Sequence, residues 1–343
     1  MMHISTFETT PNIAVVKYWG KRDEKLVLPN NSSISMTLAA PTTVTTVMFS
    51  PHFEDYEFWL NGKKQNVNDK ELRERLVVLD DIRGMAGMHY GAKIVSVNNF
   101  PTAAGFASSA SGLAALVCAA SKAAMLDLSA KELSMLARLG SGSACRSVYG
   151  GFVKWQKGKK KDGSDSFAEQ IAPPTHWPEI RLVSAVVDAG KKAISSRAGM
   201  KQTVETSPTF KKRLKWVETA FDKMCTAIKK KDFQTFADIT MKESDSMHSV
   251  MADTKPSIVY LNETSREVME KVRQLNSRHG RFVAAYTFDA GPNPHIYTTS
   301  PHVAKVKELL LDMKKVKEVF VTTAGNGPRE LKEHLLDENG DLV

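Results

Sequence analysis

Helical periodicity runs through four long segments of the chain. In residues 70–88 the apolar side chains Leu72, Leu76, Leu79 and Ile82 recur three and four positions apart, a spacing that puts them on one helix face. The second half of the chain repeats this pattern three times. We therefore predict helices over residues 70–88, 208–230, 233–251 and 263–279.

Strand patterns dominate the first part of the chain and recur between the helices. Residues 42–49 are rich in β-branched side chains, and residues 93–98 alternate apolar with polar positions. Residues 56–60 lead into Asn61-Gly62, a dipeptide that favours a hairpin turn. Later strands are predicted over residues 150–156, 180–187, 282–288 and 318–322.

The pattern changes near residues 185–200, where strand-rich sequence gives way to helix-rich sequence. We place a domain boundary there, with a first domain over residues 1–187 and a second over residues 188–343. Strands and helices occur in both halves, which predicts two α+β domains with a cleft between them.

The chain of 343 residues carries a formal net charge of +9, from 47 Lys and Arg against 38 Asp and Glu. A basic surface attracts anions such as nucleotides, phosphorylated metabolites or nucleic acid, but an ordinary solvated surface gives the same charge. We interpret the lysine runs at residues 159–161 and 229–231 as solvated surface. The charge therefore permits a phosphorylated substrate without specifying one.

The three cysteines, Cys118, Cys145 and Cys225, are odd in number and lack the spacing of a zinc site. A disulfide framework is not expected, and a reducing compartment fits best. Residues 1–10 contain no apolar core of a signal peptide, and no apolar run approaches the roughly 20 residues that span a bilayer. We expect a soluble, cytoplasmic protein with no membrane partner.

A loop of small residues follows the strand predicted at 93–98. Its glycine and alanines allow a ligand to approach the backbone, and a helix starting near Ser108 would direct its free N–H groups into the loop. This arrangement binds phosphate, although a serine-capped helix after a turn has the same sequence pattern. The loop is neither a Walker A loop nor a dinucleotide fingerprint. The phosphate-contacting candidates are Ala104, Gly105, Ala107, Ser108, Ser109 and Ser111.

The segment from Ser141 to Arg146 predicts the start of a helix, with Ser141 or Ser143 as its N-cap. Ser143 and Arg146 are three positions apart and would share a helix face. From there the planar guanidinium of Arg146 could bind a carboxylate or a phosphate through two hydrogen bonds. A capped surface helix with a solvated arginine is the alternative.

Asp289 directly follows the predicted strand 282–288 and precedes a Gly-Pro turn, so its carboxylate is well placed to face a cleft. Turns often begin with aspartate, which is the alternative explanation, and we interpret His295 as structural. Lys17 and Lys21 follow another strand and could meet phosphates as point charges. The aromatic residues between these lysines are of a kind that more often belongs to a core.

Together these motifs resemble the mevalonate diphosphate decarboxylase family, a branch of the GHMP kinase superfamily. The resemblance covers nearly the whole chain, from Asn12 to about Pro328. The segments that mark the decarboxylase branch are Lys-Tyr-Trp-Gly-Lys from Lys17, Ser-Gly-Ser-Ala-Cys-Arg from Ser141, and Asp-Ala-Gly-Pro-Asn from Asp289. The resemblance implies an α+β GHMP kinase fold, with an N-terminal domain similar to ribosomal protein S5 domain 2 and a C-terminal ferredoxin-like domain. It also implies an active site between the domains and a homodimer.

The resemblance further implies that (R)-5-diphosphomevalonate and ATP are converted to isopentenyl diphosphate, CO2, ADP and phosphate, with Mg2+, in isoprenoid and sterol biosynthesis. It makes Asp289 the base at the substrate 3-hydroxyl. Lys17 would orient Asp289 and stabilise the transferring phosphoryl group, and Arg146 would bind the substrate carboxylate. The implied substrate-binding residues are Tyr18, Trp19, Gly20, Lys21, Arg73, Ser141, Gly142, Ser143, Ala144, Cys145, Arg146, Ser196 and Arg197.

The same resemblance assigns the small-residue loop to the phosphates of ATP. Phosphates and water would largely coordinate the metal, so no protein metal site is expected. Many members have threonine after the serine that Ser196 matches, whereas this chain has Arg197. The family's diphosphate-binding arginine matches Arg73 or Arg75, and we favour Arg73.

Two other functions fit parts of the sequence. A GHMP-family kinase, or a decarboxylase of a related mevalonate phosphate, would share the fold. Ser141, Ser143 and Arg146 argue against it, because they supply partners for both a carboxylate and a diphosphate. A nucleic-acid-binding S5-like protein would need basic residues interleaved with exposed aromatics on one face, which the sequence does not clearly show, and we expect no nucleic-acid partner.

Overall fold

A six-stranded sheet forms one end of the molecule. The computed structural model describes residues 3–100, 108–187 and 194–343, and for Ser108 the backbone alone. The sheet order is β16 (Arg329–Leu331), β1 (His3–Thr9), β6 (Thr43–Ser50), β9 (Gly91–Asn98), β7 (Tyr56–Leu60), β8 (Lys63–Gln65). All neighbours pair antiparallel except β7 and β9, which are parallel.

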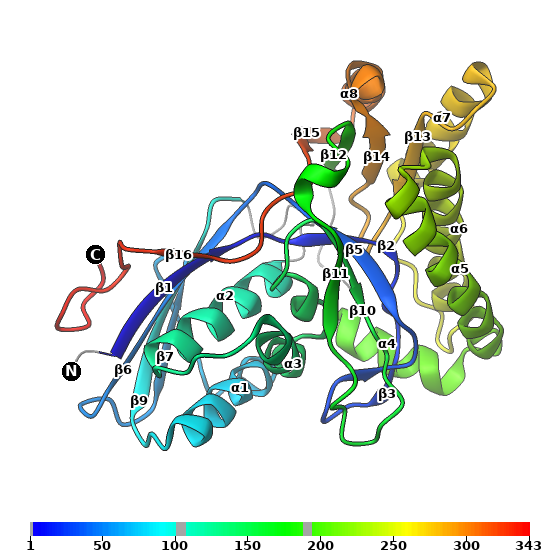
Figure 1. Cartoon of the computed structure of the whole chain (residues 1–343). Coiled ribbons are helices and arrows are strands. Elements are labelled where there is room, and N and C mark those ends of the chain that lie inside the picture. The colour runs from blue at the N-terminus through cyan, green and yellow to red at the C-terminus, as the bar shows by residue number, and fades with distance from the viewer. Residues whose placement is uncertain (1–2, 101–107, 188–193) are drawn as a thin grey trace.

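Three helices cover one side of this sheet (Figure 1). They are α1 (Lys70–Ala86), α2 (Ser108–Ala123) and α3 (Ala130–Gly140). Their apolar faces meet the sheet in one cluster, in which Leu76 and Leu79 of α1 and Leu116 of α2 pack with Val47 and Ile94 of the strands. The apolar face predicted for the helix over residues 70–88 is therefore buried, as expected.

A second, four-stranded antiparallel sheet lies near the middle of the molecule. Its order is β11 (Ala168–Ala172), β10 (Phe152–Trp155), β5 (Ser33–Thr37), β2 (Asn12–Val16). It packs against the helices α5 (Phe210–Lys230) and α6 (Phe233–Ala252). A short ribbon of β3 (Lys21–Asp23) and β4 (Leu28–Pro29) extends from it, close to α4 (Ser196–Thr206).

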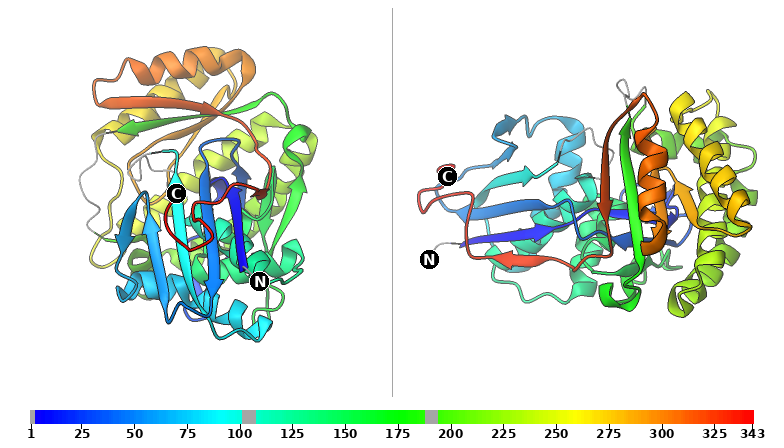
Figure 2. Two further views of the ribbon diagram at one scale, coloured as in Figure 1. Left: turned by 90° about the vertical axis from the view of Figure 1, so that its left-hand side faces the viewer. Right: turned by 90° about the horizontal axis from the view of Figure 1, so that it is seen from above.

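The third sheet is antiparallel and belongs to the second half of the chain. Its order is β13 (Ala284–Thr287), β14 (His295–Thr299), β12 (Ile180–Val187), β15 (Val316–Thr322), with α6, α7 (Glu263–His279) and α8 (Val303–Leu311) packed on it. Figure 2 shows this sheet and α8 above the six-stranded sheet. One hydrophobic cluster continues from Ile13 and Phe152 of the second sheet through Phe236 of α6 to Tyr297 of β14. The second and third sheets therefore share a core.

Most predicted elements are confirmed, and one is wrong. The helices predicted over residues 70–88, 208–230, 233–251 and 263–279 are α1, α5, α6 and α7. The helix expected from Ser141 is only a 3₁₀ turn, Gly142–Arg146, and the Ser141 side chain makes no capping hydrogen bond. The small residues there pack closely against Tyr18 and Trp155, and the turn ends after five residues.

The cysteines and the lysine runs lie as predicted. Cys118, Cys145 and Cys225 are free thiols. Lys159, Lys160 and Lys161 are exposed, as are Lys229, Lys230 and Lys231. Among the described residues, no helix combines the length and the apolar character needed to cross a membrane.

Candidate active site

A buried lysine and a partly exposed aspartate meet where β2 and β13 end. Lys17 directly follows β2, and Asp289 follows β13 by two residues. Lys17 Nζ donates to Asp289 Oδ1 over 2.6 Å. The lysine side chain is 2% exposed and the aspartate side chain 35%. The fold therefore brings together two predicted residues from opposite halves of the chain, and leaves part of the carboxylate open.

The two charges set each other's protonation. Burial lowers the pKa of Lys17 below its ordinary value, and the Asp289 carboxylate opposes this effect. Burial acts to raise the pKa of Asp289, but the Lys17 ammonium and other nearby cations outweigh it, so that this pKa lies below its ordinary value. Asp289 is therefore ionised at neutral pH and can accept a proton or a hydrogen bond on its open side.

Arg146 is a buried cation whose hydrogen-bond partners are neutral. Its Nε donates to Ser35 Oγ at 2.8 Å, its Nη1 to Ser33 Oγ at 2.6 Å, and its Nη2 to Asn12 Oδ1 at 3.1 Å. It is 2% exposed, and within the described ranges no carboxylate lies at ion-pair distance from it. Burial accordingly lowers its pKa, and nearby acids such as Asp289 oppose the shift. An unpaired buried charge is costly, so an anion brought to this guanidinium would be strongly stabilised.

Hydroxyl groups stand near this cation on the 3₁₀ turn. Ser141 Oγ and Ser143 Oγ lie 3.5 Å apart, and both residues are half-buried. The Tyr18 ring packs edge-on against Trp155 with centroids 4.8 Å apart, and Tyr18 Oη is buried with no hydrogen-bond partner among the described residues. Gly142 lies under that ring: a Cβ at Gly142 would be 2.8 Å from Tyr18 Cε1. These groups could donate to the oxygens of a phosphorylated acid.

Other predicted substrate residues are placed in packing roles. Trp19 is 2% exposed and belongs to an apolar cluster with Met200 and Tyr260. Ala144 and Cys145 are also fully buried, and burial raises the pKa of the Cys145 thiol to about 12. Their contact with a substrate stays a prediction, and their side-chain burial favours a supporting role.

Gly20 and Lys21 lie at the start of the short β3–β4 ribbon. Gly20 adopts a φ of +95°, and a Cβ there would lie 2.6 Å from Phe210 Cζ, so only glycine fits. Lys21 is 7% exposed, and its ammonium pairs with Glu24. The lysine predicted to bind phosphate is therefore already neutralised by a carboxylate in the described structure.

The arginines of α1 and α4 differ in their surroundings. Arg73 is exposed, and Arg75 donates to Glu71 on its own helix. Arg197 pairs with Glu74 and donates to the carbonyl of Gly140 at 3.3 Å, which places it beside Ser141. Ser196 is half-buried at the first position of α4. The structure thus gives Arg197 a bridging contact between helices, and the choice between Arg73 and Arg75 stays open.

The predicted ATP-phosphate loop is only partly described. Ala104, Gly105 and Ala107 lie outside the described residues, and α2 begins at Ser108. Ser109 is half-buried in the first turn of α2, where free N–H groups point along the helix axis. Ser111 is fully buried, and its hydroxyl lies 2.7 Å from Thr43 Oγ1 of β6. Ser111 therefore contacts the sheet, and Ser109 is the better placed of the two for a ligand.

No metal cage is present in the described part of the chain, where no three His, Cys, Asp or Glu side chains gather as a set of ligands. Mg2+ fits such a site well, because it keeps several waters and is commonly held by substrate phosphates with one or two carboxylates. The donors near the site are serines and a helix N-terminus, which suit phosphate oxygens.

Several site residues were not predicted. Asn12, Ser33 and Ser35 form the neutral cradle of Arg146, and Arg213 and Glu243 form a buried pair behind Lys17. Ser33 and Ser35 alternate with the apolar Ile34 and Met36 in β5, so they point to one face. That alternation was the one local signal that could have revealed them.

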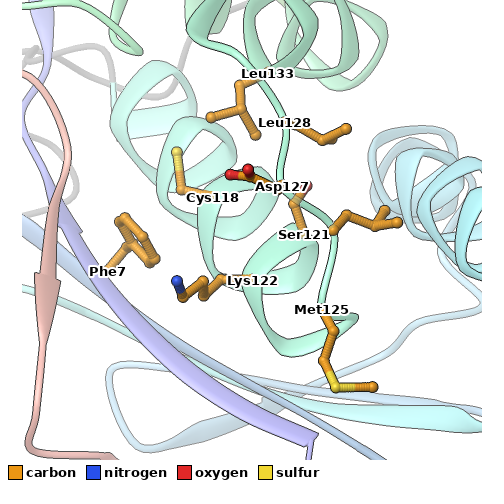
Figure 3. Close-up of a pocket in the computed structure, with 9 residues that line it drawn as sticks. Phe7, Cys118, Ser121, Lys122, Met125, Asp127, Leu128 and Leu133 are labelled. Atoms are coloured by element: carbon orange, nitrogen blue, oxygen red, sulfur yellow. The ribbon is translucent and has the colours of Figure 1, made fainter.

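A separate cavity of about 400 Å³ lies beside the C-terminal half of α2 (Figure 3). Phe7 of β1, Cys118 and Lys122 of α2, and Leu128 and Leu133 beyond it line the space. No predicted site residue contributes to this lining, so the cavity is not part of the candidate active site.

The fold and the site define the class of protein: a two-domain α+β enzyme of the GHMP type. A family model described as the diphosphomevalonate decarboxylase-like N-terminal domain matches residues 9–168. A second, the mevalonate 5-diphosphate decarboxylase C-terminal domain, matches residues 182–318.

Individual relatives agree with these matches. The diphosphomevalonate decarboxylase of Debaryomyces hansenii is 40% identical over 99% of this chain and 98% of its own length. The solved mevalonate diphosphate decarboxylase of Staphylococcus aureus superposes with a TM-score of 0.90 at 34% identity, covering 97% and 99% of the two chains. A solved structure of MDDEF in complex with MVAPP, AMPPCP and magnesium gives a TM-score of 0.88 at 40% identity, covering 97% and 100%. The chain belongs to the diphosphomevalonate decarboxylase family, which confirms the resemblance and the decarboxylase activity that it implied.

Proposed function

We propose that this chain catalyses the ATP-dependent decarboxylation of (R)-5-diphosphomevalonate to isopentenyl diphosphate, releasing CO2, ADP and phosphate. The observation that carries the proposal is that the site contains two buried cations, Lys17 and Arg146, with different partners. Lys17 meets a partly open carboxylate at 2.6 Å, whereas the described partners of Arg146 are neutral. A substrate that needs both a base and a counter-ion for its carboxylate matches this arrangement.

The substrate hydroxyl is tertiary and is a poor leaving group, so it is first phosphorylated by ATP. Asp289 accepts the hydroxyl proton or its hydrogen bond as the oxygen attacks the γ-phosphorus. Lys17 fixes the orientation of Asp289 and stabilises negative charge on the transferring phosphoryl group. Phosphate then leaves, and the electron pair of the breaking bond to the carboxylate forms the alkene as CO2 departs.

Arg146 holds the substrate carboxylate through the first step. Its guanidinium is fixed by Ser33, Ser35 and Asn12, so the cation is oriented before the substrate arrives. Ser141, Ser143 and Tyr18 would donate hydrogen bonds to the oxygens of the substrate diphosphate. Residues near the start of α2, with Ser109 in the first turn, would bind the phosphates of ATP. Mg2+, held by those phosphates, would offset their negative charge.

Three further properties belong to the same proposal. We propose two domains that divide near residues 187 and 188; the two family models divide slightly earlier in the chain, between residues 168 and 182. We propose a homodimer, which size-exclusion chromatography with light scattering would test. We also propose a cytoplasmic location, which fractionation of cells would test.

The proposal is tested by measuring ADP and CO2 release from purified protein with ATP, Mg2+ and diphosphomevalonate. We expect equal amounts of ADP and CO2. Release of ADP without CO2 would make the chain a kinase, and release of neither product would overturn the proposal.

A further inference from the structure

A second ion pair lies behind Lys17 and is closed to solvent. Arg213 of α5 donates to Glu243 Oε1 of α6, and their side chains are 1% and 0% exposed. The pair is incompletely satisfied: Arg213 Nε and Nη1 and Glu243 Oε2 have no hydrogen-bond partner among the described residues. Burying two charges with unpaired atoms costs free energy that apolar side chains of similar size would not cost.

The closed pair contacts the backbone of Lys17 from both sides. The Lys17 amide donates to Glu243 Oε1 at 2.9 Å, and Arg213 Nη2 lies 3.5 Å from the Lys17 carbonyl oxygen. Asn31 Nδ2 donates to that same carbonyl at 2.8 Å. Two helices of the second half of the chain thus fix a residue that belongs to the first half.

The charges of the pair also act on the Lys17 ammonium. Burial lowers the pKa of Lys17, whereas the carboxylates of Asp289 and Glu243 raise it and the nearby Arg146 lowers it. Burial in turn raises the pKa of Glu243, and Arg213, the Lys17 amide and the Lys17 ammonium oppose this. His248 of α6 also interacts with Lys17, Asp289 and Arg213, and its pKa of about 4 keeps it neutral. His295 and Tyr297 are further titratable groups that act on Asp289 or are acted on by it.

We propose that Glu243 and Arg213 are positioning residues for the proposed reaction: they hold the Lys17 backbone so that its ammonium meets Asp289. The Glu243 carboxylate also favours the charged form of that ammonium. The inference rests on the proposed function only for the reaction in which Lys17 acts. A buried ion pair with unpaired atoms is poorly suited to stabilising the fold. We assign it instead the role of setting the geometry and charge of the site. Neither residue need touch the substrate.

The test uses the full chain with the double substitution Glu243→Gln and Arg213→Met, which removes both buried charges together. We expect it to fold, with a thermal midpoint within a few degrees of the wild type, because buried ion pairs replaced by neutral side chains often keep stability. We expect kcat to fall roughly 10- to 100-fold, since a misplaced catalytic group costs about that much. The KM for ATP should change less than about twofold, because the proposed binding contacts to the ATP phosphates come from the start of α2 and not from this ion pair.

The pH profile separates positioning from a structural role. Without the Glu243 carboxylate the pKa of Lys17 falls further, so the alkaline limb of kcat should move to lower pH. A matched control is the double substitution Asp245→Asn and Arg273→Met, an ion pair between α6 and α7 with half-exposed side chains that does not contact Lys17. We expect this control to keep the wild-type kcat and pH profile.

Three outcomes would overturn the inference. A folded double variant with wild-type kcat and pH profile would show that Lys17 does not depend on the pair. An unfolded double variant would make the pair an element of stability. A loss of kcat equal to that of the control would make the effect non-specific. Absence of turnover in the wild type would instead refute the proposed function, and the two failures are thus distinguishable.

Discussion

The two ion pairs around Lys17 differ mainly in their access to solvent. In the pair Lys17–Asp289 the carboxylate is 35% exposed, whereas in the pair Arg213–Glu243 neither side chain exceeds 1%. Both pairs join the two halves of the chain to the same lysine, one through its ammonium and the other through its backbone. The open carboxylate can reach a substrate hydroxyl, but the closed one can reach only protein. The two ion pairs are made of similar residue types, and their difference in solvent exposure gives one a role in the chemistry and the other a role in supporting the site.

Asp289→Asn should have the largest effect, because it removes the open carboxylate and leaves Lys17 without its main partner. Removing a general base costs about 10²- to 10⁴-fold in rate, and we expect kcat to fall in that range. Nucleotide affinity, measured by titration with a non-hydrolysable ATP analogue, should stay near the wild-type value. The control Asp238→Asn changes an aspartate of a surface pair with Lys242 and should retain kcat. Unchanged kcat in Asp289→Asn would remove Asp289 from the chemistry.

Arg146→Lys should have the next largest effect. Lysine keeps the charge but loses the planar group that Ser33, Ser35 and Asn12 orient. We expect a loss of about 2–4 kcal/mol of transition-state stabilisation, measured as kcat/KM for diphosphomevalonate. Arg138→Lys is a matched control, since Arg138 is also buried but donates to the carbonyls of Gly163 and Ser166. A loss below tenfold for Arg146→Lys would argue against a carboxylate role.

His248 should make the stability of the protein depend on pH. Burial lowers the pKa of His248 to about 4, below its ordinary value, and Lys17 and Arg213 add to the shift while Phe288 and Asp289 oppose it. A lowered pKa means that the unfolded chain binds the extra proton first, so stability is full above about pH 6.5 and is lost as the pH falls towards 4. The total contribution is about 3 kcal/mol.

Urea denaturation of the wild type and His248→Asn at pH 7 and pH 4.5 measures this effect. The difference in unfolding free energy between the two proteins should change with pH by a few kcal/mol. His52→Asn, at an exposed histidine, should show no such change. A His248→Asn protein with the same pH dependence as the wild type would refute this prediction.

Gly142→Ala should have the smallest effect, on the hydroxyl side of the site. A Cβ at Gly142 would lie 2.8 Å from both Tyr18 Cε1 and Trp155 Cη2. Overpacking of this kind costs about 1–3 kcal/mol of stability, and displacement of Tyr18 should raise the KM for diphosphomevalonate. Gly84→Ala in α1 is the control, because a Cβ there meets nothing within 4 Å and alanine favours a helix. A wild-type KM and melting temperature in Gly142→Ala would contradict the packing argument.

Much of the fold could be predicted from the sequence because its elements are strongly periodic. The helix predicted over residues 263–279 has the observed bounds of α7, and the strand over residues 180–187 those of β12. The turn at Gly142–Arg146 was predicted wrongly as a helix, since a serine before small residues looks like a cap. Whether that turn continues as a helix depends on Tyr18 and Trp155, which are distant in sequence.

The site was predictable where family motifs mark it and hidden where long-range contacts build it. Asp289 and Arg146 lie in distinctive segments, and His295, interpreted as structural, is buried with Nδ1 2.8 Å from Ser184 Oγ. Glu243 and Arg213 sit on long amphipathic helices, where a charged residue normally faces solvent. Only the three-dimensional structure shows that both point inwards to Lys17, because no local pattern separates a buried charge from an exposed one.

The most direct test of the central claim is a rapid-quench single turnover of ATP with diphosphomevalonate in the wild type and Asp289→Asn. The open carboxylate of Asp289 acts at the phosphoryl-transfer step. The wild type should therefore form ADP and CO2 in equal amounts, and Asp289→Asn should form neither at a comparable rate. Formation of ADP at the wild-type rate by Asp289→Asn would contradict this role.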